Sequence, residues 1–195
     1  MLSNIRPAIV MIALFTLLTG LIYPLAVTGI AGLLFRSQAE GGMIRDAAGQ
    51  VVGARLIGQG FAKPQYLHPR PSAAGTGYDA SNSAGTNRGP LNPKLADRMA
   101  TDAAAIRKDA PGAAIPADAV TTSGSGLDPD ISPAYAHLQA PRIAAARHVS
   151  AADLDAVITA RTGGAFLGFI GQPHVNVLQL NRALDARFPV GHPAG

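Results

Sequence analysis

The pattern of apolar and polar positions divides the chain into an apolar N-terminal stretch and a remainder of mixed polarity. Twenty-nine residues without a charge stand between Arg6 and Arg36. Because a hydrocarbon core of about 30 Å is crossed by about 20 helical residues, this stretch predicts a transmembrane helix over 7–35 after a short N-terminal segment, 1–6. A cleaved signal peptide, the rival interpretation, has an apolar region of only about 7–15 residues, so the length favours a span that is retained.

Pro24 lies in the middle of the predicted span, where its missing backbone donor predicts a kink. Small residues four apart flank it, Thr16 with Gly20 and Thr28 with Gly32. This spacing lets a second helix approach closely, although glycine and threonine are also common in membrane helices that have no partner. A lone anchor needs neither a kink nor a smooth face, so we interpret Gly20, Pro24 and Gly32 as candidate partner contacts.

The remainder, 36–195, is predicted to form a single α+β domain. Alternating residues on either side of the turn 46–49 predict a short hairpin, and 175–177 predict another strand. N-cap patterns predict helix starts at Asn92-Pro93, at Ser132-Pro133 and at Ser150 with Asp153; Pro141 predicts a further short helix, and Val177, Leu180, Leu184 and Phe188 predict one face of a last helix. The predicted fold class is therefore α+β, with one N-terminal transmembrane helix before a small extramembrane domain that has a small sheet and several short helices.

A long loop over 61–93 is rich in glycine, serine, asparagine and proline. Such a composition is typical of a flexible linker, yet a loop of this length inside a compact domain is usually functional or disordered. It contains Arg70 and Tyr78, which a plain spacer would not need, and Asn87. We interpret Arg70, Tyr78 and Asn87 as candidate contacts to a partner.

The charge and the composition exclude several classes of function. The net charge is +4, but the only adjacent basic pair is Arg107-Lys108, and aromatic residues make up 5% of the chain. A nucleic-acid groove usually needs clustered cations with stacking aromatics, so no nucleic-acid partner is expected. The chain has no cysteine, which excludes disulfides, thiolate catalysis and cysteine-ligated metals.

The strongest chemical motif is the run Ser123, Gly124, Ser125 and Gly126, followed by Leu-Asp-Pro. Its backbone N–H groups could cradle a phosphate, but a P-loop would need lysine after the second glycine, and the local sequence favours a tight turn between segments. The serines lack the flanking pattern of a hydrolase nucleophile, and the five histidines lack the spacing of metal ligands. The sequence therefore predicts no catalytic residue, no metal site and no enzyme that works alone.

Five groups of motifs occur in a fixed order behind the span. They are Leu56-Ile57-Gly58-Gln59; Tyr66 with Arg70-Pro71-Ser72-Ala73; Gly89-Pro90 with Asn92-Pro93; Ser123-Gly124-Ser125-Gly126-Leu127-Asp128-Pro129 with Ile131-Ser132-Pro133; and Leu167-Gly168-Phe169 with Val175-Asn176-Val177-Leu178. In this order the chain resembles the C subunit of the bacterial Kdp potassium-transporting ATPase over nearly its whole length. It departs from that family's usual pattern at Thr86-Asn87-Arg88, where Ser-Asn-Leu is common, and at Gln172 and His174, where an acid and an arginine are common.

The resemblance implies an accessory subunit of an ATP-driven, high-affinity potassium uptake pump. Its implied partners are a channel-like potassium-binding subunit, an ATP-hydrolysing subunit and a small single-span subunit. It implies a single-pass protein of the bacterial inner membrane, with residues 1–6 in the cytoplasm and the large domain on the periplasmic side.

The family is also described as a catalytic chaperone that raises the ATP affinity of the hydrolysing subunit, with the run 123–126 as the natural nucleotide contact. A periplasmic domain cannot reach cytoplasmic ATP, so the resemblance places ATP at the level of the complex, potassium as the transported ion, and no firmly bound cofactor on this chain. From the residues alone, a membrane-tethered binding protein or enzyme of the cell envelope, unrelated to transport, stays open as the alternative.

Overall fold

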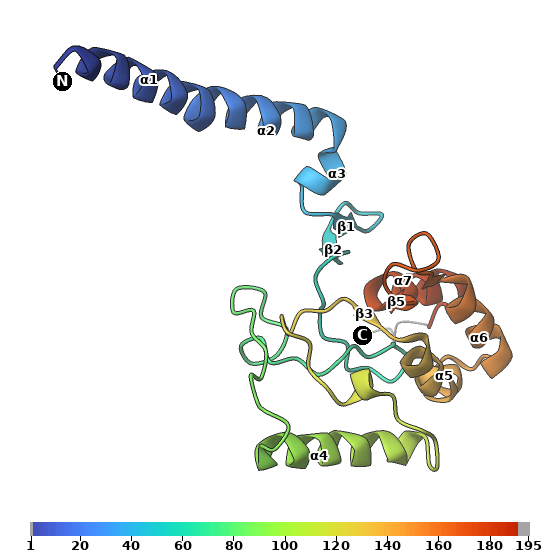
Figure 1. The fold of residues 1–195 in the computed structure, drawn as a ribbon. Helices are drawn as coiled ribbons and strands as arrows, with labels where there is room; N and C mark the ends of the chain where they lie inside the picture. Colours follow the sequence, from blue (N-terminus) through green and yellow to red (C-terminus); the bar gives the residue numbers. More distant parts are fainter. Residues whose placement is uncertain (1, 191–195) are drawn as a thin grey trace. The chain divides into compact units, whose positions relative to one another are not determined.

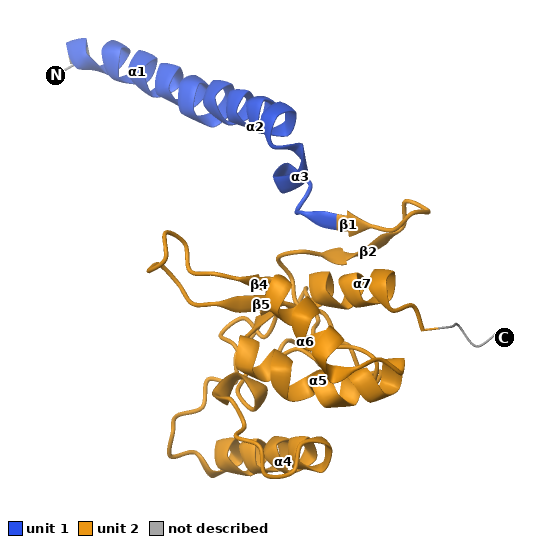
Figure 2. Cartoon of the chain, turned by 90° about the vertical axis from the view of Figure 1, so that its right-hand side faces the viewer, with its two compact units in different colours: residues 1–43 blue, residues 44–195 orange. Residues whose placement is uncertain are grey.

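A computed structural model describes residues 2–190 and divides the chain into two compact units, 1–43 and 44–195 (Figures 1 and 2). The first unit is mainly helical, and the second contains both helices and strands. This arrangement confirms the predicted fold class, an apolar N-terminal helix followed by a small α+β domain.

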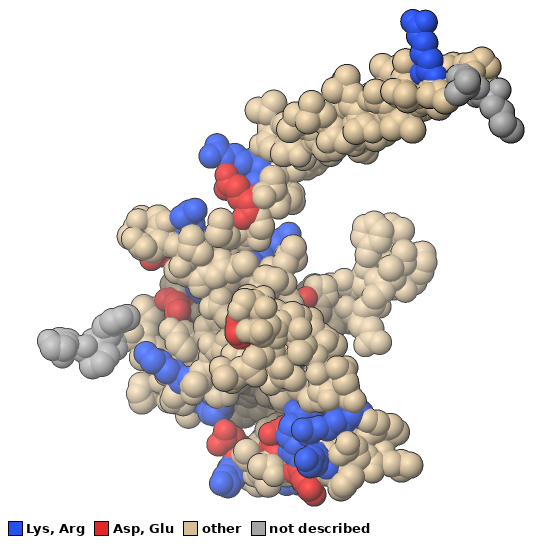
Figure 3. Space-filling view, turned by 90° about the vertical axis from the view of Figure 1, so that its left-hand side faces the viewer, with Lys and Arg blue, Asp and Glu red and all other residues tan. Residues whose placement is uncertain are grey.

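The first unit is dominated by one continuous apolar helix, Ile5–Leu34. It consists of α1 (Ile5–Leu17), a π-helical turn η2 (Leu18–Ile22) and α2 (Tyr23–Leu34), with a 3₁₀ turn η1 (Leu2–Asn4) before it and α3 (Arg36–Ala39) after it. At about 1.5 Å per residue its 30 residues extend about 45 Å, which is enough to cross a hydrocarbon core with tilt. None of its most apolar window is buried inside the chain, and in Figure 3 its surface is charged only near its ends.

The π turn explains how the span accommodates Pro24. A proline in a regular helix cannot donate a hydrogen bond and collides with the carbonyl four residues earlier. Immediately before Pro24, the N–H of Tyr23 donates to the carbonyl of Leu18, five residues back, and Thr19 Oγ1 donates to the carbonyl of Phe15 at 2.6 Å. The disturbance expected at Pro24 therefore takes the form of a widened turn, after which the helix continues as α2.

The domain opens on the predicted hairpin, β1 (Met43–Arg45) with β2 (Val51–Ala54). Asp46 organises its turn, because its Oδ1 accepts from the N–H groups of Ala48 and Gln50, both at 2.9 Å. A second, three-stranded antiparallel sheet has the order β3 (Asp130–Ile131), β5 (His174–Asn176), β4 (Thr162–Gly163), so that Val175 pairs with both Ile131 and Thr162.

Four α-helices and one 3₁₀ turn complete the described part of the domain: α4 (Pro93–Asp109), η3 (Ala117–Ala119), α5 (Pro133–Arg147), α6 (Ala151–Ala160) and α7 (Val177–Arg187). The predicted N-caps Asn92, Ser132 and Ser150 are confirmed, since each side chain accepts from a backbone N–H of the first helical turn. Asn176 caps α7 in the same way.

Two sequence expectations about these helices are corrected. Pro141 does not open a separate helix but lies inside α5. An internal proline costs a helix about 3 kcal/mol, but Ala140, Ile143 and Ala144 bury that face of α5 in the core, and this burial outweighs the loss. Thr162 and Gly163 follow the end of α6 as predicted, but they also form β4, a strand that was not predicted from the sequence.

The hydrophobic core lies between α5, α6, α7 and the three-stranded sheet. Its fully buried aliphatic side chains are Leu67, Ile143, Leu154, Ile158, Val175, Leu180 and Leu184. Helix α4 lies at the edge of the domain in Figures 1 and 2 and contributes only partly buried side chains, Met99, Ala103 and Ile106. The core thus fixes one end of the long loop through Leu67. It also fixes the two ends of the segment that contains the glycine-rich run, through Val120 and Ile131.

Candidate functional site

The long loop 61–93 is fastened to the core by two side-chain amides. Asn181 on α7 is 1% exposed; its Oδ1 accepts from the N–H of Leu67 at 2.7 Å, and its Nδ2 donates to the carbonyl of Leu67 at 3.0 Å. Gln139 on α5 pairs in the same way with both backbone groups of His68, at 2.8 and 3.0 Å. These four hydrogen bonds give buried backbone the partners that a strand would otherwise supply, so this part of the loop is an ordered element rather than a linker.

A third buried polar side chain, Arg147 at the end of α5, holds the start of the same loop. Its guanidinium donates to the carbonyls of Gln65 and Phe188 and to Asp185 Oδ1 at 2.8–2.9 Å, and it lies over the ring of Tyr66, 5.3 Å from the centroid. None of Asn181, Gln139 and Arg147 was predicted as a functional residue from the sequence. The one available signal was that all three are polar residues at apolar-face positions of predicted helices.

The glycine-rich run lies against the second half of the loop, where the green and yellow traces meet in Figure 1. The Ser125 carbonyl accepts from the N–H of Ala84 and from Ser83 Oγ, both at 3.0 Å, and the Gly126 carbonyl accepts from Ser72 Oγ at 2.6 Å. The two segments are therefore joined by backbone carbonyls that accept from the loop 72–84.

Gly126 is the point of closest approach. It has a φ of +68°, and a Cβ placed there would lie 2.5 Å from the carbonyl oxygen of Ala84 and 2.7 Å from the backbone nitrogen of Ala74. Both neighbours are backbone atoms, so only glycine fits. Gly124, two residues earlier, has no atom within 4 Å of such a Cβ. The two glycines of the motif thus have different environments.

The serines of the run close their own turn. Ser123 Oγ accepts from the N–H of Gly126 at 2.9 Å, and Ser125 Oγ accepts from the N–H of Leu127 at 3.1 Å. A phosphate cradle depends on N–H groups that point at the ligand. Two of the N–H groups that could serve it are already used, while Gly124 and Ser125 are exposed.

Arg70 and Tyr78, predicted as partner contacts, lie inside this junction: Arg70 joins the loop to the residues that flank the run, and Tyr78 binds Arg70. The Arg70 guanidinium donates to Asp128 Oδ2 at 2.8 Å and to the carbonyls of Thr121 and Thr122 at 3.3 and 3.2 Å. The Tyr78 hydroxyl donates to the carbonyl of Arg70, and burial raises the pKa of Tyr78 to about 12. The structure therefore brings Arg70 and Tyr78 together with the run 123–126, and both side chains have internal partners.

The other predicted contacts lie elsewhere. Asn87 is exposed on the loop with a φ of +50°. A Cβ added at Gly20 or Gly32 in the apolar helix would meet no atom within 4 Å, and Pro24 lies in the first turn of α2. These four residues are available to another molecule, and their role as contacts stays a prediction.

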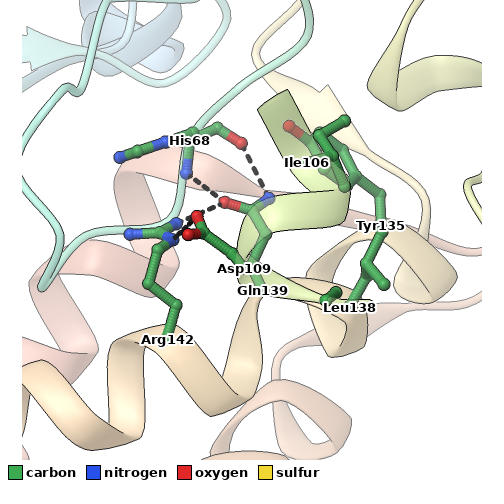
Figure 4. Close-up of a pocket in the computed structure, with 8 residues that line it drawn as sticks. His68, Ile106, Asp109, Tyr135, Leu138, Gln139 and Arg142 are labelled. Carbon is green, nitrogen blue, oxygen red and sulfur yellow. Dashed lines mark hydrogen bonds and ion pairs between the residues drawn. The ribbon is translucent and has the colours of Figure 1, made fainter. Parts of the chain in front are cut away.

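A small cavity lies between α4, α5 and the part of the long loop that contains His68 (Figure 4). It has a volume of about 50 Å³ and is lined by His68, Asp109, Tyr135, Gln139 and Arg142, among others. Burial, together with the nearby Arg142, lowers the pKa of His68. A pocket for a small-molecule ligand usually measures about 300–1,000 Å³, so this cavity has room for water rather than for a nucleotide.

Within residues 2–190, no three histidine or acidic side chains are grouped so that they could hold a metal ion. What the arrangement provides is a long loop that is hydrogen-bonded both to the core and to the glycine-rich run.

A helix long and apolar enough to cross a membrane, followed by a small α+β domain, fits a single-pass membrane protein. The family model for the c chain of the K⁺-transporting ATPase matches residues 5–186, and the chain belongs to this family, that of the KdpC subunits. Among its relatives, the potassium-transporting ATPase KdpC subunit of Caulobacter vibrioides (strain NA1000 / CB15N) is 66% identical over 189 residues, which are 97% of this chain and 96% of the relative.

Two further relatives carry the same name. That of Beijerinckia indica subsp. indica is 60% identical over 195 residues, 99% of this chain and 98% of the relative; that of Koribacter versatilis is 47% identical over 193 residues, 99% and 100%. The accessory role in a potassium pump, inferred from the motif order, is thereby confirmed, and the family decides against an envelope protein unrelated to transport.

Proposed function

We propose that the apolar helix packs against helices of partner subunits while the domain docks on the outer face of the channel-like subunit of the pump. The observation that supports this proposal most strongly is a series of small residues along the apolar helix. Thr16, Gly20, Pro24, Thr28 and Gly32 follow one another at intervals of four residues, and the glycines leave open space beside the backbone. Such a series allows close helix–helix approach in lipid, where packing rather than the hydrophobic effect drives association.

The domain supports docking through its rigidity. Asn181, Gln139 and Arg70 fix residues 67–70 from within, and Ser83 and Ala84 are hydrogen-bonded to the Ser125 carbonyl, so the loop is held at two places on either side of its exposed positions 80–82. A surface that is ordered before it binds loses less conformational entropy on association. In this proposal the chain contributes assembly and stability to the complex and carries out no chemistry of its own.

Replacing Gly20 and Gly32 by leucine is expected to reduce co-purification of the pump's other subunits about tenfold from mild detergent, because overpacking a close contact costs about 1–3 kcal/mol and about 1.4 kcal/mol is a tenfold change in affinity. The measurement is the ratio of partner subunits to this chain after affinity capture. Ala26→Leu, which adds bulk to the same helix outside the series of small residues, serves as the matched control. Undiminished recovery with both glycines replaced would contradict the helix contact.

We further propose that the domain lies on the periplasmic side, as the family resemblance implies. Leu91 is 96% exposed and the chain has no cysteine, so Leu91→Cys provides a single reactive thiol on the domain. A membrane-impermeant maleimide is expected to label it in intact spheroplasts as fully as in lysed ones. Labelling only after lysis would place the domain in the cytoplasm and overturn the proposed orientation.

The second candidate is contact with the nucleotide of the ATP-hydrolysing subunit through Ser123, Gly124, Ser125 and Gly126. The exposure of Gly124 and Ser125 favours it, whereas the internal hydrogen bonds of Gly126 and Leu127 favour a structural turn. Direct contact also requires a cytoplasmic domain, so the labelling experiment bears on both candidates.

A further inference from the structure

The loop between β4 and β5 carries a cluster of exposed apolar side chains. Phe166, Leu167, Phe169 and Ile170 are 69%, 70%, 76% and 51% exposed. Residues 162–173 contain no charge, and the hairpin extends out of the domain in Figure 2 and forms an uncharged protrusion on the right of Figure 3. A contiguous apolar patch of this kind on a soluble surface marks an interaction site.

The hairpin tip is built so that apolar side chains can leave water without exposing its backbone. The N–H groups of Phe166 and Ile170 donate to each other's carbonyls at 2.8 and 2.9 Å, and those of Gly168 and Phe169 donate within the turn. Leu167 has a φ of +53°, a conformation that favours glycine or asparagine. A leucine held there, with its side chain exposed, indicates that the side chain rather than the turn is what the position requires.

Three arginines lie next to this hairpin. Arg55, Arg161 and Arg182 line one cleft of about 450 Å³ together with Ile44. A neighbouring cleft of about 290 Å³ shares Arg55 and Arg161 and reaches the base of the hairpin at Gly163 and His174. All three arginines are exposed, and none forms an ion pair with any residue in 2–190.

One acid, Asp130, lines the second cleft, and there it accepts from the Asn176 amide at 2.9 Å. The exposed Leu56 lies in the same lining. The surface thus combines three guanidinium groups that have no acidic partner within residues 2–190 with an apolar, uncharged protrusion beside them.

We propose that the tip 166–170 inserts into the headgroup region of the bilayer that the chain's own helix crosses, with Arg55, Arg161 and Arg182 on the phosphates of anionic lipids. The inference rests on the proposed single-span anchoring. Aromatic and aliphatic side chains beside arginines suit the interface of an anionic membrane, because the rings enter the headgroup boundary while guanidinium pairs with phosphate.

Chain connectivity favours the bilayer as the occupant. Residues 35–43 link the apolar helix to Ile44, and fully extended they reach about 30 Å, so the domain is kept close to the membrane surface. Ile44 lines the arginine cleft, and Arg55 directly follows β2. The basic face therefore includes Ile44 and Arg55, which follow the span closely in sequence, and chain connectivity keeps this side of the cleft near the bilayer.

The test uses the full chain, whose lack of cysteine allows one environment-sensitive fluorophore at Leu167→Cys. The chain is reconstituted, alone and within the assembled pump, in vesicles of phosphatidylcholine or of phosphatidylcholine with roughly one third phosphatidylglycerol, each with and without a doxyl-labelled lipid quencher. We expect the quencher to remove more than half of the emission at position 167 in the anionic vesicles, and little of it from the same probe at Leu91→Cys.

The arginines are tested by Arg55→Gln, Arg161→Gln and Arg182→Gln in one chain. These changes are expected to abolish the phosphatidylglycerol dependence of quenching, whereas Arg107→Gln with Lys108→Gln on α4 should leave it intact. The proposal would be overturned if the lipid quencher left the probe at the tip unquenched in both preparations. It would also be overturned if the probe were shielded from water but unquenched in the assembled pump alone, because that result would assign the tip to a protein partner. Co-purification of the labelled chain with the other subunits reports on the proposed function separately.

Discussion

Replacing Asn181 by leucine is expected to destabilise the domain by about 3 kcal/mol, because it removes the partners of two buried backbone groups at once. Asn181 supplies both the acceptor for the N–H of Leu67 and the donor for its carbonyl, and Leu67 is completely buried. Leucine is no smaller than asparagine, so the cost comes from unsatisfied hydrogen bonds rather than from a cavity. The measurement is the urea dependence of proteolysis of the full chain in detergent.

Gln179→Leu is the matched control for this change. It lies on the same helix, α7, and its side chain makes no hydrogen bond within the described residues, since only its backbone N–H takes part. The control is expected to shift the free energy of unfolding by less than about 0.5 kcal/mol. Equal stability of the two variants would show that the loop at Leu67 is not held by Asn181, and the proposed rigidity of the docking surface would lose its main support.

The sequence predicted the elements whose signals are local. The length of the uncharged stretch predicted the span, and the N-caps Asn92, Ser132 and Ser150 marked three helix starts correctly. Pro141 misled because its local preference for a helix start was overridden by burial of α5. The strand β4 was missed because its two residues pair only with β5, a contact that no local pattern encodes.

The candidate site was predictable as a set of residues but not as an arrangement. The motif order singled out Arg70 and the run 123–126, the residues of the long loop singled out Tyr78, and the structure brings these together. The hydrogen bonds that join the loop to the run could not be read from sequence, because Arg70 is 58 residues from Asp128 and Ser72 is 54 residues from Gly126. The same limit applies to Asn181, whose side-chain amide takes the place of a strand partner for Leu67.

Replacing Gly126 by alanine is expected to cost about 3 kcal/mol or more, the largest effect expected within the glycine-rich run. A side chain at a φ of +68° is strained by about 1–2 kcal/mol, and the new Cβ would also lie 2.5 Å from the carbonyl oxygen of Ala84. Since the backbone on both sides must move, the hydrogen bonds from Ser72 and Ala84 to the run should be lost together. The same urea-dependent proteolysis measures the loss.

Gly124→Ala distinguishes a structural role of the run from a nucleotide contact. Its Cβ meets no atom within 4 Å, and its φ is not left-handed, so the change should alter stability by less than about 0.5 kcal/mol. If the run acts as a joint between loops, the pump with Gly124→Ala should also keep its ATP affinity. A phosphate that approaches the exposed backbone at Gly124 would meet the new methyl group, so a selective rise in the KM for ATP, with stability unchanged, would favour direct nucleotide contact. Because the two glycines stand two residues apart in one motif, the contrast between them separates the role in folding from the role in the pump's ATPase cycle.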